Sequence, residues 1–312
     1  MTAQTLDVVV PIFNEEGAIH ELVSRTRVAL DQIEGLDWRL ILVENGSKDG
    51  SHLAIQQELQ KDSRIVEVQL LRNFGMEGGL LAGLSITTGD ACVMMQGDLE
   101  DPPEVVPEFV KSWRAGHDVV YGEVSSRNSL PIWRRVLTAI FYLLAKYLTN
   151  GLIRPNASDF RLISGPVRDF LVATPDQGVF LRSLVMWPSE RVASIPFVRG
   201  SRHSGETKFR AGKAIFFSLI GMLGQSIKPL RLITLLGVFA FASSVLGLAF
   251  LTFRALFWSV PFAGFGTIVG FQLLFFGILM LAIGVVSEYI AMIFQEVRPR
   301  PRFIIHQIHQ AT

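Results

Sequence analysis

The fold of this chain is decided by residues 91–103, which read ACVMMQGDLEDPP. The apolar run ends at Met95, three acidic residues follow within four positions, and a Pro-Pro pair closes the stretch. This pattern is typical of a buried strand that delivers carboxylates to the rim of a sheet. Asp98 and Glu100 are two positions apart, so on an extended backbone their side chains point the same way and can share one Mg²⁺ or Mn²⁺. Taken by itself, the stretch has an alternative interpretation as a solvated acidic turn that caps the next helix.

The residues before this stretch alternate between strand and helix patterns. Apolar runs that predict buried strands cover residues 6–13, 40–43 and 65–71, and helical spacing covers 19–33, 51–60 and the segment through 80–84. With the strand at 91–95 the order is β-α-β-α-β-α-β, which predicts an α/β domain with a mostly parallel sheet. Ligands of such sheets bind at the carboxyl ends of the strands, where the sequence places Asn14-Glu15, Glu44-Asn45, Arg72-Asn73 and Asp98 to Glu100.

The net charge, the cysteine content and the missing motifs of the chain argue against several classes of protein. Its 312 residues carry a net charge of only +1, so no nucleic-acid partner is predicted. The single cysteine, Cys92, cannot form an internal disulfide and indicates a reducing compartment. The G-x-G-x-x-G motif that forms the phosphate-binding turn of nicotinamide-binding folds does not follow the first strand, so the sequence does not predict such a fold. The polar start of the chain predicts no signal peptide.

The C-terminal part carries the signals of a membrane protein. Two uncharged runs, 232–253 and 262–287, have 22 and 26 residues, more than the ~20 that cross a hydrocarbon core. Cations lie before the first run and after the second, whereas Arg254 alone lies between them, which predicts both termini in the cytoplasm. We therefore predict a transmembrane helical hairpin over 231–290 and a cytoplasmic tail over 291–312. A buried soluble hairpin is the alternative.

Two further segments combine cations with apolar residues. The segment 131–148 is apolar on one face and predicts a helix over about 131–150 that lies on lipid headgroups, with a core helix as the alternative. A juxtamembrane amphipathic helix is predicted over 211–230. Between residues 191 and 231, eight Lys or Arg stand against the single acid Glu206, and such a basic stretch attracts an anionic headgroup.

Five motifs in register resemble the family 2 glycosyltransferases that act on polyprenyl phosphates, which include dolichyl-phosphate mannose synthases and bacterial undecaprenyl-phosphate glucosyltransferases. The motifs are VPIFNEE at 10–16, VENGSKD at 43–49, RNFG at 72–75, QGDLEDPP at 96–103 and SDFRL at 158–162. The resemblance runs from about Leu6 to Phe209 and continues into the membrane segments. It implies a Rossmann-like, A-type nucleotide-sugar-binding domain over 1–210, on the cytoplasmic side.

The resemblance also implies a role for individual residues. Nucleotide-sugar binding falls to Pro11, Phe13, Asn14, Glu15, Glu44, Asn45, Ser47, Arg72, Asn73, Gln96, Gly97 and Asp98. The metal ligands are Asp98 and Glu100, the catalytic residues are Asp159, Arg202 and Lys208, and the acceptor-phosphate residues are Arg134, Arg135, Arg161, Arg202, Thr207 and Lys208.

Three residues depart from the family pattern. Gln96 replaces an Asp and Glu100 replaces a Gln, so one carboxylate is lost and one gained, which preserves metal binding on charge grounds. Asn45 stands where an Asp is common and adds a hydrogen-bond donor.

The implied activity is inverting transfer of one sugar from a nucleotide diphosphate to a polyprenyl phosphate, at the plasma membrane. UDP-glucose and undecaprenyl phosphate are the expected substrates, and GDP-mannose or an N-acetylhexosamine on UDP is the alternative donor. A processive polysaccharide synthase fits less well, because it needs further spans and a Gln-x-x-Arg-Trp motif. A scaffold without activity is the other alternative, since Gln96 replaces an Asp. A homo-oligomer is left open.

Overall fold

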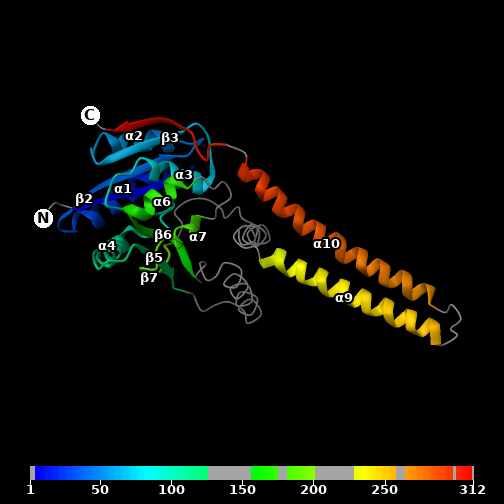
Figure 1. Ribbon diagram of the computed structural model, residues 1–312. Helices are drawn as coiled ribbons and strands as arrows, with labels where there is room; N and C mark the ends of the chain where they lie inside the picture. The colour runs from blue at the N-terminus through cyan, green and yellow to red at the C-terminus, as the bar shows by residue number, and fades with distance from the viewer. Residues whose placement is uncertain are drawn as a thin grey trace. The chain divides into compact units, whose positions relative to one another are not determined.

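The computed structural model describes residues 4–125, 156–174, 181–200, 228–257, 264–297 and 300–310. The chain divides into two compact units, Met1–Ala211 with Arg300–Thr312, and Gly212–Pro299. The first unit holds a sheet with helices on both faces, and the second holds two long helices (Figure 1).

An eight-stranded sheet in the order β7-β5-β6-β4-β1-β2-β3-β8 forms the centre of the first unit. The strands are β1 (Gln4–Ile12), β2 (Leu36–Glu44), β3 (Ile65–Leu70), β4 (Ala91–Met94), β5 (Val119–Val124), β6 (Ala157–Ser164), β7 (Val192–Phe197) and β8 (Ile305–Gln310). Strands β1 to β4 are parallel, whereas β6 is antiparallel to β4 and β8 is antiparallel to β3. The predicted α/β class is confirmed, but the sheet is mixed, because the strands from β5 onward lay outside the predicted pattern.

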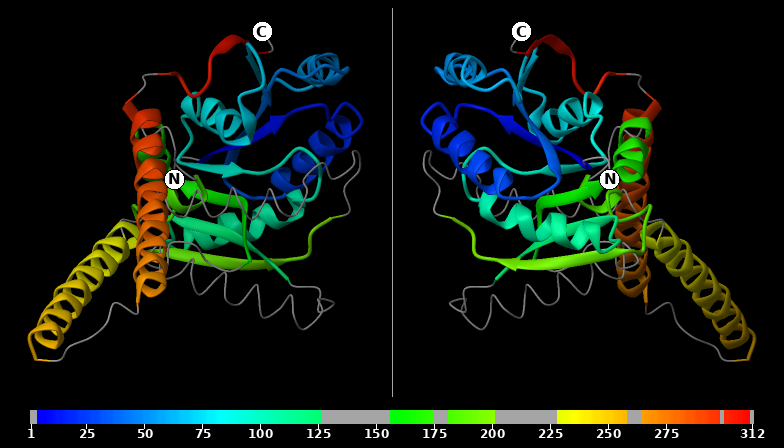
Figure 2. Two further views of the ribbon diagram at one scale, coloured as in Figure 1. Left: turned by 90° about the vertical axis from the view of Figure 1, so that its right-hand side faces the viewer. Right: turned by 90° about the vertical axis from the view of Figure 1, so that its left-hand side faces the viewer.

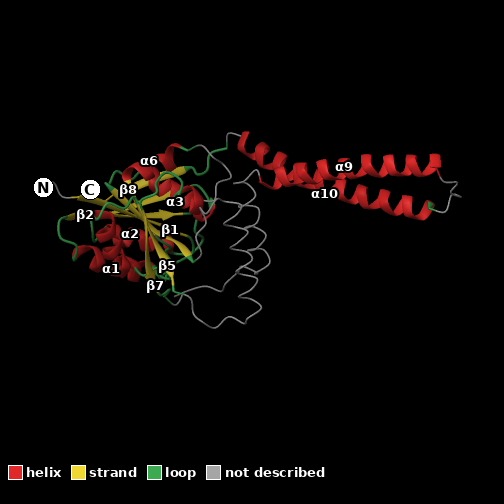
Figure 3. Ribbon diagram, turned by 60° about the horizontal axis from the view of Figure 1, so that its bottom comes forward, coloured by secondary structure: helices red, strands yellow, loops and turns green. Residues whose placement is uncertain are grey.

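Helices cover both faces of this sheet (Figures 2 and 3). One layer contains α1 (Ile19–Asp31), α2 (Ser51–Leu59) and α4 (Val106–Arg114), which follows a short 3-10 turn (Pro103–Val105). The other contains α3 (Gly75–Ser85), α6 (Gly165–Ala173) and α7 (Leu181–Leu184). Val8 and Val10 of β1 belong to the first core and Val9 to the second, as the two-residue period of a strand requires. Burial on both faces explains why β1 reads as a continuous apolar run.

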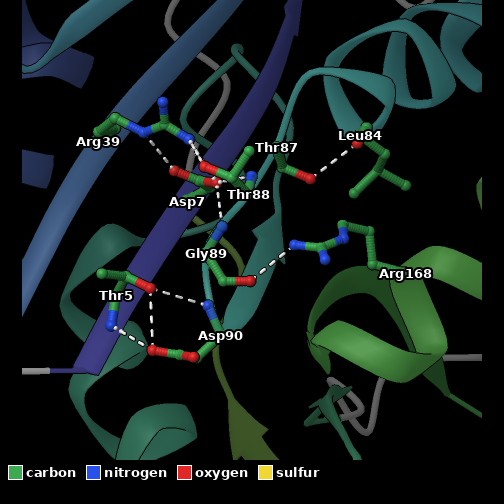
Figure 4. Close-up of polar contacts among 9 residues, drawn as sticks. All are labelled: Thr5, Asp7, Arg39, Leu84, Thr87, Thr88, Gly89, Asp90 and Arg168. Carbon is green, nitrogen blue, oxygen red and sulfur yellow. Dashed lines mark hydrogen bonds and ion pairs between the residues drawn. The ribbon is translucent and has the colours of Figure 1, made fainter.

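A polar cluster fixes the amino-terminal edge of the sheet (Figure 4). The buried carboxylate of Asp7 accepts hydrogen bonds from Arg39 at 2.8 and 2.9 Å, and from the backbone N–H groups of Thr88 and Gly89, each at 2.8 Å. Arg168 of α6 donates to the Gly89 carbonyl at 2.6 Å. These contacts attach the turn between α3 and β4 to β1 and β2, so the predicted site lies at the opposite edge of the sheet.

The second unit contains α9 (Lys228–Phe257) and α10 (Phe265–Val297), which contact each other and run antiparallel (Figure 1). Among the residues that the structure describes, one stretch is long and apolar enough to cross a membrane, Leu274–Phe294 in α10, with 21 residues and a mean hydropathy of 2.1. The predicted transmembrane hairpin stays a prediction.

The end of the chain differs from the predicted tail over 291–312. Helix α10 continues to Val297, and Ile305–Gln310 form β8 on the edge of the sheet beside β3. The run is polar because most of its side chains are exposed at a sheet edge, so its sequence carries only a weak strand signal. The predicted interfacial helix at 131–150 and most of the juxtamembrane helix at 211–230 lie outside the described residues.

Candidate active site

The loops that follow β1 and β2 hold each other through reciprocal hydrogen bonds. The Asn14 backbone N–H donates to the Ser47 hydroxyl at 3.1 Å, and the Asn14 side-chain oxygen accepts the N–H of Lys48 at 2.8 Å. The Glu15 N–H donates to the Ser51 hydroxyl at 3.0 Å. Asn14 adopts a left-handed φ of 55°, a conformation that Asn tolerates better than most residues. The two loops predicted to bind the nucleotide therefore form one structural unit.

Glu44 and Asn45 are buried beneath these loops. Glu44 accepts the backbone N–H of Ser47. The Asn45 amide donates to the Gly75 carbonyl at 2.8 Å and accepts the N–H of Phe74 at 3.0 Å. An ionised Asp has no donor for the first of these bonds, so the departure of Asn45 from the family pattern has a structural reason.

The loop after β3 touches the loop after β2 through its backbone. A Cβ at Gly46, which has a φ of 71°, would lie 2.5 Å from the Asn73 nitrogen, so this position requires glycine. The guanidinium of Arg72 lies 4.3 Å from the centre of the Phe74 ring. Arg72 and Asn73 thus join the other loops at the carboxyl edge.

Gly97 follows β4 and Phe13 follows β1, and the ends of these two strands lie close together at this same edge. A Cβ at Gly97 would lie 2.6 Å from Ile12 Cδ1 and 3.2 Å from the carbonyl oxygen of Pro11. Phe13 is exposed next to them.

The acidic turn after β4 is not the extended backbone that the sequence predicts. Leu99 is buried and has a left-handed φ of 62°, which stores strain on the order of 1–3 kcal/mol. The Glu100 N–H donates to Asp98 Oδ1 at 3.1 Å and closes a tight turn. The expectation that Asp98 and Glu100 point the same way along a strand is therefore wrong, and the turn at Leu99 sets their directions.

Asp101 completes the turn from inside the protein. Its Oδ2 accepts the N–H of Gln96 at 3.2 Å, and its buried Oδ1 has no hydrogen-bond partner in the described structure. Burial raises the pKa of Asp101 to about 7; the Gln96 N–H and the charge of Arg199 oppose this rise, and the charges of Asp98 and Asp159 add to it. Asp98 and Asp159 are thus close enough to act on one buried carboxyl group.

Strand β6 brings Asp159 to the acidic turn. Arg161 pairs with Met94 in the antiparallel ladder, so Asp159 extends past the carboxyl end of β4. Arg182 donates two hydrogen bonds to Asp159, one of them from Nε to Oδ1 at 2.8 Å. The Arg161 Nη2 lies 3.7 Å from Asp159 Oδ1. Burial acts to raise the pKa of Asp159, but Arg182, Arg161 and Arg199 hold it below its usual range. Asp159 is therefore ionised at neutral pH.

Arg161 supports this arrangement from the interior. It is fully buried and donates to the carbonyl oxygens of Arg182 at 3.0 Å and Ser158 at 2.7 Å. Burial lowers its pKa to about 10. The sequence predicts Arg161 as a phosphate ligand, whereas in the structure its guanidinium is committed to backbone carbonyls and Asp159.

The basic segment 199–209 begins directly on the acidic turn. The Arg199 Nη1 lies 3.3 Å from Glu100 Oε2, and the Gly200 N–H donates to the Glu100 carbonyl at 3.0 Å. A Cβ at Gly200 would lie 2.5 Å from the Leu99 oxygen. The predicted site residues Arg134, Arg135, Arg202, Thr207 and Lys208 lie outside the described residues.

The chemistry of this turn fits a hard divalent cation. Asp98 and Glu100 supply carboxylate oxygens, the ligands that Mg²⁺ and Mn²⁺ prefer, and the Asp101 Oδ1 is a further buried oxygen without a donor. Within the described ranges no group of three or more His, Cys, Asp or Glu forms a complete cage for an ion. The residues therefore suit an ion whose remaining ligands are substrate oxygens and water.

Arg182 and Asp101 are site residues that the sequence does not predict. Arg182 belongs to no motif and lies 23 residues from Asp159, so only the packing of α7 against β6 brings them together. Asp101 lies inside the acidic motif, where the following Pro-Pro pair signals a turn but not burial.

Comparisons with known proteins agree with this geometry. The model of glycosyl transferase family 2 matches residues 7–166. An SfII prophage-derived bactoprenol glucosyl transferase of Shigella flexneri is 32% identical over 307 residues, which cover 98% of this chain and 99% of that protein. An undecaprenyl-phosphate 4-deoxy-4-formamido-L-arabinose transferase of Pseudomonas aeruginosa is 30% identical over 310 residues, which cover 98% and 91%. A crystal structure of a mycobacterial protein has a TM-score of 0.50 at 18% identity, covers 72% of this chain and 75% of that one, and shows likeness of fold alone.

These findings confirm the predicted resemblance to the family 2 glycosyltransferases of polyprenyl phosphates. The family match begins at Asp7 within β1 and extends past β6, so it includes the loops, the acidic turn and Asp159. The chain belongs to glycosyl transferase family 2 and is an enzyme, a glycosyltransferase.

Proposed function

We propose that this enzyme transfers one sugar, with inversion, from a nucleotide diphosphate to the phosphate of a polyprenyl phosphate at the cytoplasmic face of the plasma membrane. UDP-glucose is the proposed donor, because the Shigella flexneri relative is named for glucosyl transfer and matches nearly the whole chain. GDP-mannose or an N-acetylhexosamine on UDP is the alternative, since the Pseudomonas aeruginosa relative is named for a different sugar.

The observation that carries this proposal is the arrangement around Asp159. The pairing of β6 with β4 carries Asp159 past the end of β4, where the acidic turn begins, and Arg182 and Arg161 hold its carboxylate in place and ionised. Arg182 is partly exposed, so the pair can orient an anionic acceptor without the carboxylate repelling it. Such an arrangement suits an acceptor that is itself a phosphate.

The acceptor chemistry explains why no strong general base is needed. A phosphate monoester has a second pKa of about 6 and is largely ionised at pH 7, so its oxygen attacks the anomeric carbon without losing a proton. We assign Asp159 and Arg182 to orient it, and the loops around Asn14, Glu44 and Asn45 to hold the nucleotide. A divalent cation bound by Asp98 and Glu100 would supply charge neutralisation of the diphosphate leaving group.

The fold constrains how the chain meets the membrane. β8 follows α10 and pairs with β3, so the strands that precede α9 and the strand that follows α10 belong to one sheet and lie on the same side of any bilayer. The number of crossings between them must therefore be even. Because α10 contains a stretch that is long enough to span, we propose that α9 crosses with it as a hairpin.

A donor panel tests the proposed function. Membranes from cells that express the chain would be incubated with labelled UDP-glucose, GDP-mannose and UDP-N-acetylglucosamine, and the lipid phase would be extracted. We expect label in an acid-labile lipid from UDP-glucose, dependent on Mg²⁺ or Mn²⁺. Label from another donor would correct the sugar, and label in a long polymer would point to a processive synthase. Absence of lipid label from every donor would refute the proposal.

A further inference from the structure

A buried carboxylate lies in the middle of β3, under α2. Glu67 is fully buried within a strand that is otherwise mainly apolar, and a carboxylate in such a place is costly unless it is hydrogen-bonded. Two side chains one turn apart on α2 supply the bonds. The His52 Nδ1 donates to Glu67 Oε1 at 2.7 Å, and the Gln56 amide donates to Glu67 Oε2. Each oxygen of this carboxylate is thus held by a side chain of α2.

The hydrogen bond from His52 ties the first turn of α2 to the sheet. The buried apolar side chains of this helix, Ile55 and Leu59, lie from its middle to its end. Apolar contacts are not directional, so they tolerate small shifts of a helix along a strand. A hydrogen bond to a buried carboxylate is directional and selects one register. We therefore expect the position of the start of α2 to depend on His52.

The residue before His52 connects this position to the loops that we assign to the nucleotide. Ser51 is the first residue of α2, and its hydroxyl accepts the Glu15 N–H at 3.0 Å. The same hydroxyl donates to Asp49 Oδ1 at 2.6 Å, and Asp49 Oδ2 accepts the Glu16 N–H at 3.3 Å. Every link from β3 to the loop after β1 is therefore a hydrogen bond or a peptide bond.

We propose that His52 is a positioning residue for the nucleotide, which holds Ser51 and, through it, the loop that contains Glu15. The inference rests on the proposed function in one respect, the assignment of these loops to a nucleotide. His52 lies outside the motifs at 10–16 and 43–49. A His52 variant should therefore weaken nucleotide binding and change kcat little.

Equilibrium binding of UDP and of GDP, each with Mn²⁺, provides the first test. His52→Ala should raise the Kd of the nucleotide that the wild type binds by about 10-fold, a size typical of residues that act through their neighbours. His52→Asn should recover most of the loss, because the Asn amide nitrogen is as many bonds from Cα as Nδ1 is and can donate to Glu67. A loss that His52→Asn does not recover would overturn the proposal, since the hydrogen bond would then not be the cause.

His20→Ala is the matched control. The His20 Nδ1 lies 2.9 Å from Oε1 of Glu58, so this pair also joins a histidine to a buried glutamate. Glu58 lies at the other end of α2 and keeps Lys61 as a donor at 2.6 Å. His20→Ala should match the wild type in Kd, donor KM and kcat, whereas His52→Ala should raise donor KM with little change in kcat. Equal Kd values for the two variants would contradict the proposal.

Hydrogen exchange at the Glu15 amide provides a readout that needs no nucleotide. This N–H should exchange faster in His52→Ala than in His20→Ala, because its acceptor Ser51 is no longer held. An unchanged exchange rate would refute the positioning role even if the Kd rises. If the wild type binds neither nucleotide or transfers no sugar, the proposed function fails, whereas the exchange result still tests the position of Ser51.

Glu67→Met keeps the proposal testable if His52→Ala does not fold. It replaces the buried carboxylate with an apolar side chain of similar length, a kind of change that buried ionic sites often tolerate without loss of stability. The His52 side chain is 39% exposed, so its Nδ1 can turn to water. Glu58→Met makes the same substitution at the other end of α2. We expect Glu67→Met to raise the Kd and Glu58→Met to leave it unchanged, and equal Kd values would refute the role of the Glu67 contact.

Discussion

At the scale of single residues, the site depends on one strained residue between two carboxylates. Leu99 is buried with a positive φ, and its carbonyl lies against Gly200. Strain of this kind persists only where the surrounding structure imposes it. Here the Asp98 acceptor, the Asp101 acceptor and the Gly200 backbone all hold the turn. The carboxylates that we assign to the cation are thus set in place before any ligand binds.

Removal of the Asp98 charge should show that turnover depends on a bound metal ion. Asp98→Asn should lower kcat by about 10²-fold or more, as for the loss of a positioned electrostatic contact, and should weaken Mn²⁺ binding. Asp37→Asn changes an exposed acid and serves as the control. The measurements are turnover and Mn²⁺ titration by electron paramagnetic resonance. Turnover that is insensitive to both chelator and Asp98→Asn would exclude the assigned metal role.

Asp159→Asn should separate orientation from proton transfer. The pKa of Asp159 lies below its usual range, so the group is ionised throughout the acidic limb of a pH-rate profile. That limb belongs instead to the acceptor phosphate, with a pKa of about 6. The variant should therefore have lower kcat and should retain the acidic limb between pH 5 and 7. Disappearance of the limb in Asp159→Asn would identify Asp159 as the titrating base.

At the scale of elements, the three loops that we assign to the nucleotide are held by side chains that form hydrogen bonds with the backbone. Asn45 bridges the loop after β2 to the residues at the start of α3. Ser47 and Ser51 accept hydrogen bonds from the loop after β1. These contacts order the loops before a ligand binds, so binding loses less conformational entropy.

Two Asn to Asp substitutions test this account of the loops. Asn45→Asp loses the donor to Gly75 and places a carboxylate against a carbonyl oxygen, so it should lower the free energy of unfolding by about 1–3 kcal/mol. Asn73→Asp keeps its bond, because Asn73 only accepts the Gly75 N–H, and should be nearly neutral. Urea denaturation of both variants would measure the difference. Equal stability of the two variants would contradict the assigned role of the Asn45 donor.

The Asp7 cluster at the amino-terminal edge of the sheet should affect stability but not catalysis. Asp7→Ala leaves two backbone N–H groups and the Arg39 guanidinium without their acceptor. The cost should be on the order of 3 kcal/mol, with KM unchanged in the folded protein, because the cluster lies away from the site. The midpoint of urea denaturation measures the cost. A raised donor KM in Asp7→Ala would show that the two edges are coupled.

For the molecule as a whole, the pairing of β8 with β3 constrains the membrane topology that we propose. β8 belongs to the same compact unit as the other strands, Met1–Ala211 with Arg300–Thr312, which we call the catalytic unit, so α9 and α10 either both cross the bilayer or neither crosses it. The distribution of cations around them favours two crossings with the catalytic unit inside.

Reporters at two positions test this topology. A fusion after Thr312 should report the cytoplasm, and a tag near Ser259 should be reached by an impermeant label from outside the cell. A tag protected in intact cells but labelled after permeabilisation would show that the helices do not cross. The control is a tag near Asp37, which is exposed on the catalytic unit and should be protected until permeabilisation.

The parallel half of the sheet, the carboxyl-edge loops and the family could all be predicted from the amino-acid sequence. These follow from local signals, since apolar runs, turn residues and motif spacing are readable without knowing which segments meet. The acidic turn was identified as a motif, but its geometry was not, because a left-handed Leu99 has no local signature.

The residues that complete the site could not be predicted from the sequence, because they meet only in the folded chain. Arg182 reaches Asp159, Arg161 becomes buried behind it, and the segment before β8 arrives from the far end of the chain, with the Arg302 carbonyl next to Gly78 of α3. Such contacts join residues that are distant in sequence and carry no period or motif of their own. Their positions follow from how β6, α7 and β8 pack against the parallel strands, and packing is a property of the whole chain.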